Sequence, residues 1–136
     1  MEEELKSVDY SDRTILVCDD EDAYRKFLNK ILVKFLKARV LIASNPGEMF
    51  ELLKSEKPDL IVLDLQMPVM DGQTALKLLR EDTATELIPV IICSALGFES
   101  VIINIAKLNI SGFIIKPFEA SIVLQKIHQV LSSQRK

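Results

Sequence analysis

Acidic, hydroxyl and amine side chains stand at the ends of short apolar runs in this chain. Asp19 and Asp20 follow the first run, Asp64 follows a second, and Ser94 and Lys116 come directly after two more. Three carboxylates held close together repel one another, so they either take up protons or hold a cation. Oxygen ligands without histidine or cysteine suit Mg²⁺, an ion that also binds phosphate oxygens.

The same residue types are those that phosphoryl transfer requires. A carboxylate can attack phosphorus to form an acyl phosphate. A lysine and Mg²⁺ would offset the charge of the transferring group, and a serine hydroxyl could donate a hydrogen bond to it. The spacing therefore predicts a phosphoryl-transfer site only if the apolar runs bring Asp64, Ser94 and Lys116 together.

The apolar runs are typical of buried strands, and helical patterns separate them. Continuous apolar strands favour a sheet covered on both faces. Strict alternation of strands and helices predicts an α/β fold, with a parallel sheet and helices on both sides. In such a sheet ligands bind beyond the carboxyl ends of the strands, where the polar residues stand. The predicted strands cover residues 14–18, 39–43, 60–63, 89–93 and 112–115.

Apolar residues at intervals of three and four predict the helices between the strands. Pro46 favours the first turn of one helix, and Asp71-Gly72 is the turn signal before another. The only histidine, His128, is expected at the surface of the last helix. The expected helices cover about residues 24–35, 46–55, 72–81, 99–108 and 120–131.

Length and composition indicate one ordinary globular domain. The chain has 136 residues, of which 49% are hydrophobic and 27% charged, with a formal net charge of −3. The acidic balance argues against nucleic acid or an anionic membrane surface as the main partner. We expect a domain over residues 13–132, with polar tails at 1–12 and 133–136.

Location follows from the cysteines and from the apolar runs. Cys18 and Cys93 lie within apolar runs and lack zinc-type spacing, so we interpret them as small buried hydrophobes. No stretch approaches the roughly 20 apolar residues needed to cross a bilayer, and the acidic start is unlike a signal peptide. We therefore expect a cytoplasmic protein without membrane contact.

Four sequence blocks in this order resemble the receiver domain of two-component response regulators, the family of the chemotaxis receiver. The resemblance covers about residues 13–132, and the separations between the blocks are similar to those of the family. It implies a flavodoxin-like, doubly wound sheet of five parallel strands in the order 2-1-3-4-5. The blocks are ILVCDDE at 15–21, LIVLDLQMPVMDG at 60–72, ICSA at 92–95 and KPF at 116–118.

The resemblance also implies a role for each residue of the site. Asp64 matches the phosphoacceptor, which takes a phosphoryl group from the histidine of a sensor kinase or phosphotransfer protein. Asp19 and Asp20, with Asp64 and the backbone carbonyl of Gln66, match the Mg²⁺ ligands. Further positions match the family cation Lys116, the switch residues Ser94 and Phe113, and the cis peptide of Lys116-Pro117.

Three positions depart from the commonest pattern of the family. Phe113 lacks the hydroxyl of tyrosine, so a switch through that hydrogen bond is absent. Gln66 and Leu96 stand two residues after Asp64 and Ser94, where the family tunes the lifetime of the acyl phosphate. A bulky apolar Leu96 is expected to shield the phosphoryl group from water, so a Leu96→Glu variant should lose it faster.

The output of such a domain would be an interaction surface. In the family this surface consists of the fourth helix, the fifth strand and the last helix. Here the fourth helix, at 99–108, has a narrow polar stripe and wide apolar flanks. We expect a downstream protein effector, or a homodimer through this surface, and no direct binding of DNA.

Other functions stay open at this point. A pseudo-receiver would bind partners without phosphorylation, although such proteins typically lose one of the site residues. An aspartate-nucleophile phosphatase would need a second aspartate where Gln66 stands, and a flavin site would need a phosphate loop where 19–22 is acidic. Asp20 or Glu21 could instead be a cap of the first helix. The expectation is a signalling domain that gains and loses its own phosphoryl group, not an enzyme.

Overall fold

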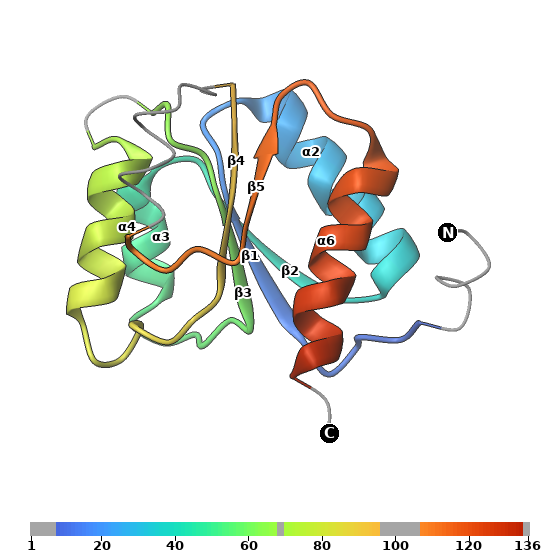
Figure 1. The fold of residues 1–136 in the computed structure, drawn as a ribbon, viewed down its shortest axis with the longest axis horizontal. Coiled ribbons are helices and arrows are strands. Elements are labelled where there is room, and N and C mark those ends of the chain that lie inside the picture. Colours follow the sequence, from blue (N-terminus) through green and yellow to red (C-terminus); the bar gives the residue numbers. More distant parts are fainter. Residues whose placement is uncertain (1–7, 68–69, 96–106, 135–136) are drawn as a thin grey trace.

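Five parallel strands form one sheet in the order β2-β1-β3-β4-β5, as predicted (Figure 1). The computed structural model describes residues 8–67, 70–95 and 107–134. Four strands lie where the sequence placed them, and β4 begins and ends one residue later than predicted. The strands are β1 (Thr14–Cys18), β2 (Arg39–Ala43), β3 (Leu60–Leu63), β4 (Val90–Ser94) and β5 (Gly112–Ile115).

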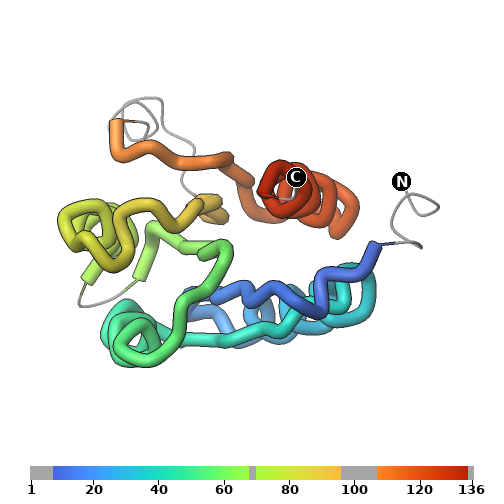
Figure 2. The backbone as a smooth tube through the Cα atoms, turned by 90° about the horizontal axis from the view of Figure 1, so that it is seen from below, coloured from blue at the N-terminus to red at the C-terminus, as the bar shows by residue number. Residues whose placement is uncertain are grey.

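Helices cover both faces of the sheet, as Figures 1 and 2 show. One layer consists of α2 (Asp22–Ile31), the π-helical turn η1 (Leu32–Leu36) and α6 (Ala120–Ser133). The other contains α3 (Pro46–Leu52) and α4 (Gly72–Glu81). Side chains alternate along β1, so Ile15 and Val17 join the first core while Leu16 and Cys18 join the second. This double burial explains the continuous apolar strands.

The first helix differs from its prediction at its C-terminal end. The pattern over 24–35 predicted one α-helix, whereas the α-helix ends at Ile31 and continues as η1. Leu32 and Leu36 remain buried in the first core through this wider turn. Apolar periodicity therefore continues across the change, which is why the pattern alone did not locate it.

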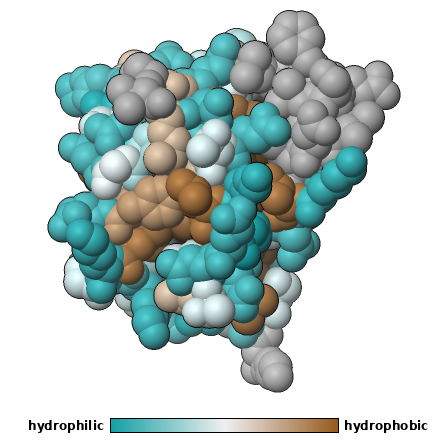
Figure 3. Space-filling view, turned by 90° about the vertical axis from the view of Figure 1, so that its left-hand side faces the viewer, coloured by the Kyte–Doolittle hydropathy of each residue, from teal (hydrophilic) through white to brown (hydrophobic). Residues whose placement is uncertain are grey.

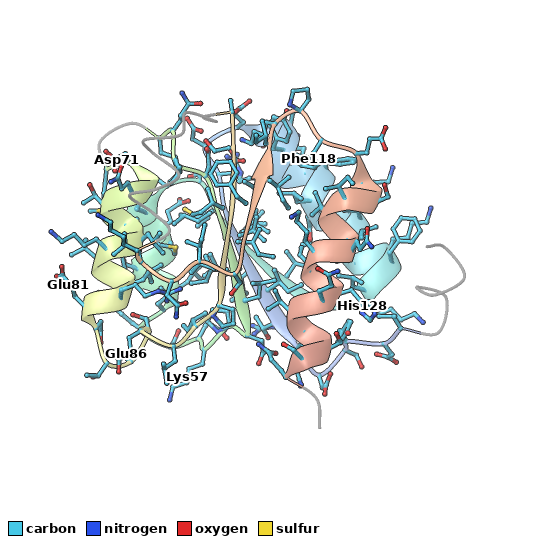
Figure 4. All side chains as sticks on the ribbon, in the orientation of Figure 1. Lys57, Asp71, Glu81, Glu86, Phe118 and His128 are labelled. Carbon is cyan, nitrogen blue, oxygen red and sulfur yellow. The ribbon has the colours of Figure 1, made fainter. Side chains whose placement is uncertain are left out.

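Val8 and Tyr10, before β1, pack against the domain. Val8 and Tyr10 are buried in the first core, and the Tyr10 amide donates to the Leu36 carbonyl at 2.9 Å. The Tyr10 hydroxyl lies 2.7 Å from Nδ1 of His128, a residue that is partly buried on α6 (Figure 4). Val8 and Tyr10 therefore lie in the core although they fall within the predicted 1–12 tail, because isolated apolar residues among acids showed no periodicity. The predicted surface position of His128 is corrected to a partly buried one.

Helix caps set where the second layer begins. Asn45 accepts a hydrogen bond from the Glu48 amide at 2.8 Å, and Asp71 accepts one from the Thr74 amide at 2.8 Å. The sequence predicted both starts, although α3 ends at Leu52, before the expected residue 55. Cys18 and Cys93 are buried, as expected. The expected helix at 99–108 and Leu96 fall outside the described residues, apart from 107 and 108, which lie in a turn.

Within the described ranges, no helix is long and apolar enough to cross a membrane.

Candidate functional site

Four polar side chains meet at the carboxyl edge of the sheet. The Asp64 amide donates to the Cys18 carbonyl at 3.0 Å, which places Asp64 beside Asp19 at the ends of β3 and β1. The Lys116 amide donates to the Ser94 carbonyl at 2.9 Å, which places Lys116 beside the end of β4. All four side chains belong to buried residues. The sequence predicted that these residues meet at one edge of the sheet, and the parallel register of the strands confirms it.

Asp19 and Asp64 use their carboxylates in the same way. One oxygen, Oδ1, accepts from the backbone amide two residues further on: Glu21 for Asp19 at 2.9 Å, and Gln66 for Asp64 at 3.0 Å. The other oxygen, Oδ2, faces the Lys116 ammonium, at 2.6 Å from Asp19 and 3.4 Å from Asp64. Each loop thus orients its own aspartate toward the shared lysine.

The Lys116 side chain is surrounded by carboxylates and an aromatic ring. Its side chain is only 1% exposed, and Oε1 of Glu21 lies 3.2 Å from its Nζ. The ring of Tyr24, on α2, lies under the ammonium at 4.1 Å from Nζ to the ring centroid. Phe118 lies against that ring, with the two centroids 5.4 Å apart. The lysine is therefore held by three carboxylates and one aromatic face.

The charges of this cluster shift the titration of its members. Burial raises the pKa of Asp19 above its ordinary value, and the hydrogen bond from Lys116 opposes the shift only in part. Burial alone would lower the pKa of Lys116, but the hydrogen bond to Asp19 and the charges of Asp19 and Asp64 raise it above the ordinary value. The lysine consequently stays protonated at neutral pH, within a cluster that carries more negative than positive charge.

The excess negative charge is arranged as a cation site would require. Oxygens of Asp19, Asp20, Glu21 and Asp64 all lie within 4.8 Å of one another. Asp19 and Asp64 are buried, whereas Asp20 and Glu21 are exposed, so an ion could approach from solvent. Hard oxygen donors without nitrogen or sulfur are the ligands that Mg²⁺ prefers. The residues present therefore fit Mg²⁺.

Sequence reasoning missed part of this cluster. Glu21 was considered only as a helix cap, and it stands at the N-cap of α2 without a side-chain capping bond. Its carboxylate instead contacts Lys116, 95 residues further along the chain. Four consecutive acids directly after a strand, at 19–22, were the available signal. For Gln66 the structure shows its amide bound to Asp64, and the role of its carbonyl stays a prediction.

Gly72, the first residue of α4, holds the backbone of the Asp64 loop at close range. A Cβ at this position would overlap the Asp64 carbonyl oxygen and lie 2.6 Å from the Leu65 Cα. The Gly72 amide donates to the Leu65 carbonyl at 3.0 Å. Only glycine permits this approach, so the turn signal in the sequence has a specific role in positioning Asp64.

The remaining residues named from the sequence lie on or next to β4 and β5. Ser94 is the last residue of β4 and is fully buried. Phe113, in β5, is partly buried and packs against the second core. The Lys116-Pro117 peptide is cis, as the resemblance implied. The roles of Ser94 and Phe113 as switch residues stay predictions.

Comparison with known proteins finds relatives of a single family. A family model described as the response regulator receiver domain matches residues 15–128. The chain is 39% identical over 118 residues to the chemotaxis protein CheY of Bacillus subtilis, covering 87% of this chain and 97% of that protein. It is 32% identical over 119 residues to CheY of Thermotoga maritima, covering 87% and 97%. A solved CheY-like receiver domain protein from Methanospirillum hungatei matches with a TM-score of 0.80 at 25% identity, covering 90% of this chain and 95% of that chain.

Proposed function

Because the chain belongs to the response regulator receiver domain family, we propose that Asp64 accepts a phosphoryl group from the histidine of a sensor kinase or phosphotransfer protein. The observation that carries this proposal is the position of Asp64. Its buried carboxylate lies at a strand end, within an acidic cluster and 3.4 Å from the ammonium of Lys116. Such a site can both attack phosphorus and stabilise the charge that develops on it.

The transfer requires one bond to form and one to break. An Asp64 carboxylate oxygen forms a bond to phosphorus while the phosphorus–nitrogen bond of the phosphohistidine breaks, and the imidazole keeps the electron pair and takes up a proton. Lys116 places a positive charge beside the transferring group, and the loops of Asp19 and Asp64 hold their carboxylates in place. Mg²⁺, held by Asp19, Asp20 and Asp64, would supply further positive charge for the phosphoryl oxygens.

We further propose that phosphorylation changes a protein-binding surface on β5, α6 and the segment before β5. Ser94 pairs with Ile115 in the register of β4 and β5, its carbonyl accepts from the Lys116 amide, and Phe113 lies in β5. Ile115 on β5 is 53% exposed and Ile122 on α6 is 44% exposed. These exposed apolar side chains fit a protein partner or a second copy of the chain.

Acetyl phosphate tests the central proposal without a kinase. With Mg²⁺ we expect the intact mass of the protein to rise by one phosphoryl group as acetate leaves. Asp64→Asn should remove the gain, and a chelator should prevent it. Asp71→Asn is the matched control, because asparagine also caps α4 and Asp71 lies outside the acidic cluster.

Two results would contradict the assignment. A wild-type protein that gains no phosphoryl group would point to a receiver that binds partners without phosphorylation. A gain that persists in Asp64→Asn would place the acceptor on another residue. For the surface, sedimentation of the protein with and without beryllofluoride separates the homodimer from a monomer that binds an effector.

A further inference from the structure

A hollow between α3 and α4 lies far from the acidic edge and on the opposite face of the sheet from α2 and α6. It has a volume of about 570 Å³ and is called here the α3–α4 groove. Figure 3 shows this side of the molecule, where an apolar band is flanked by hydrophilic side chains. The groove is lined by Phe50, Leu78, Glu81, Asp82 and Thr83.

Leu78 lines this groove and does not pack into either core. The helix α4 packs on the sheet through Ala75, Leu76 and Leu79, which are buried. Leu78 is 40% exposed and belongs to neither core cluster of the described residues. An apolar side chain held in this way would gain free energy only when a partner covers it.

Two acids, Glu81 and Asp82, line the rim of the groove, and only Asp82 has a role in the local structure. Asp82 accepts a hydrogen bond from the Ala84 amide at 2.8 Å, so it shapes the turn after α4. Glu81 stands in the last turn of α4, where a negative charge opposes the helix dipole. Within residues 8–67, 70–95 and 107–134, Glu81 makes no ion pair. A positive group from a partner would offset the unfavourable interaction of Glu81 with the helix dipole and would give Glu81 an ion-pair partner.

The acidic character continues across α3. A second hollow of about 300 Å³ lies beside α3 and is lined by Ile42, Glu48, Glu51 and Leu52. Neither hollow has a lysine or arginine among its lining residues, although Glu51 pairs with Lys54 at 2.8 Å. This face therefore presents exposed apolar side chains among acids.

We propose that the α3–α4 groove binds a basic amphipathic helix of a partner protein. A groove between two helices on one sheet face accepts a third helix, with apolar side chains at i, i+3, i+4 and i+7. Those side chains would cover Leu78 and Phe50, and flanking lysines or arginines would face Glu81 and Asp82. The acids and exposed Leu78 thus select both the shape and the charge of the partner.

The position of the groove makes this binding independent of Asp64. Figure 4 shows Asp71 and Glu81 at opposite ends of α4. Gly72, next to Asp71, touches the backbone of Asp64, whereas Glu81 and Asp82 lie at the far end of the helix. The peptide should therefore bind Asp64→Asn as tightly as the wild-type protein, and this separates the proposal from the proposed function.

The test uses a synthetic peptide of about 15 residues, built from leucine, lysine and alanine with leucine at i, i+3, i+4 and i+7. Its titration into isotope-labelled protein, followed by amide NMR shifts at low salt, should map to α3 and α4. Leu78→Ser and Glu81→Lys should each weaken binding by about tenfold. Both side chains are at the surface, so circular dichroism should show unchanged folding.

Matched variants exclude general attraction between a basic peptide and an acidic protein. Val33→Ser, at 50% exposure on η1, and Glu119→Lys, exposed before α6, should leave affinity unchanged. A scrambled peptide of the same composition should not map to the groove. No binding at the highest soluble peptide concentration, or equal losses in Val33→Ser and Glu119→Lys, would overturn the proposal.

Discussion

At the scale of single residues, Lys116 depends on neighbours from several elements. Asp19 and Asp64 reach it from β1 and β3, and Tyr24 reaches it from α2 with its ring face. Under the proposed function, Asp19 and Asp64 would bind Mg²⁺ and Asp64 would carry the phosphoryl group, so the interaction of both carboxylates with Lys116 would change. The ring of Tyr24 is neutral and keeps its attraction for the ammonium throughout.

Tyr24 is therefore expected to position Lys116 for phosphoryl transfer. Under the proposed function, Tyr24→Leu should slow phosphorylation by acetyl phosphate by about threefold to tenfold, while Tyr24→Phe should keep the wild-type rate. Phe27→Leu is the control, because Phe27 lies on the same helix and contacts Phe118, with no ring contact to Lys116. Equal rates in all three variants would show that the ring has no such role.

At the scale of elements, the loops between strands and helices decide the precision of the site. The helix α4 begins at Gly72, directly against the backbone of the Asp64 loop. Its other end is fastened through Arg80, whose guanidinium donates to backbone carbonyls of two loops. One helix thus connects the Asp64 loop with the segment that leads into β5.

Replacing Gly72 tests the close approach. Gly72→Ala should lower the free energy of unfolding by about 2–4 kcal/mol, because the added Cβ overlaps backbone that cannot move aside without shifting Asp64. Gly112→Ala is the matched control, since its Cβ would meet only the Ile91 side chain at 3.8 Å. Urea denaturation measures both. Equal stability of the two variants would contradict the assigned role of Gly72.

Arg80 is expected to be irreplaceable by lysine. Its Nε donates to the Leu108 carbonyl at 2.8 Å, and its other nitrogens donate to Glu86, Ile88 and Asn109 carbonyls at 2.9–3.1 Å. A lysine cannot reproduce this planar fork, so Arg80→Lys should cost about 1–3 kcal/mol of unfolding free energy.

The control for Arg80 is an arginine with the same fork and a surface partner. Arg39, which is exposed, binds both carboxylate oxygens of partly buried Glu56, at 2.8 and 3.0 Å. Arg39→Lys should change stability much less, because lysine also pairs with a carboxylate and water screens the pair. A loss in Arg39→Lys as large as in Arg80→Lys would show that the loop contacts add nothing specific.

At the scale of the whole molecule, repulsion among the carboxylates of the site lowers the stability of the folded protein. Four carboxylates gather at the sheet edge, two of them are buried, and three contact the ammonium of Lys116. The cores on both faces of the sheet hold this arrangement together. Binding a cation relieves the repulsion, so stability and metal binding must be linked.

Mg²⁺ should therefore stabilise the native protein. At about ten times its dissociation constant, Mg²⁺ should raise the free energy of unfolding by about 1.4 kcal/mol. Asp20→Asn should reduce this gain at the same Mg²⁺ concentration, without lowering stability in a chelator, because Asp20 is exposed and its charge adds to the repulsion. Asp12→Asn, at an exposed ion pair with Arg13, should keep the full gain. Thermal unfolding with Mg²⁺ and with chelator measures all three proteins.

The sequence by itself determined the sheet and the main chemistry of the site. Short apolar runs are local signals, and parallel strands necessarily present Asp19, Asp64, Ser94 and Lys116 at one edge. Tertiary structure alone decided which other groups meet them. Tyr24 reaches Lys116 across 92 residues of chain, and Tyr10 reaches His128 across 118. The physical reason is that apolar periodicity states which face of an element is buried, whereas such contacts depend on how far each helix is shifted and rotated on the sheet.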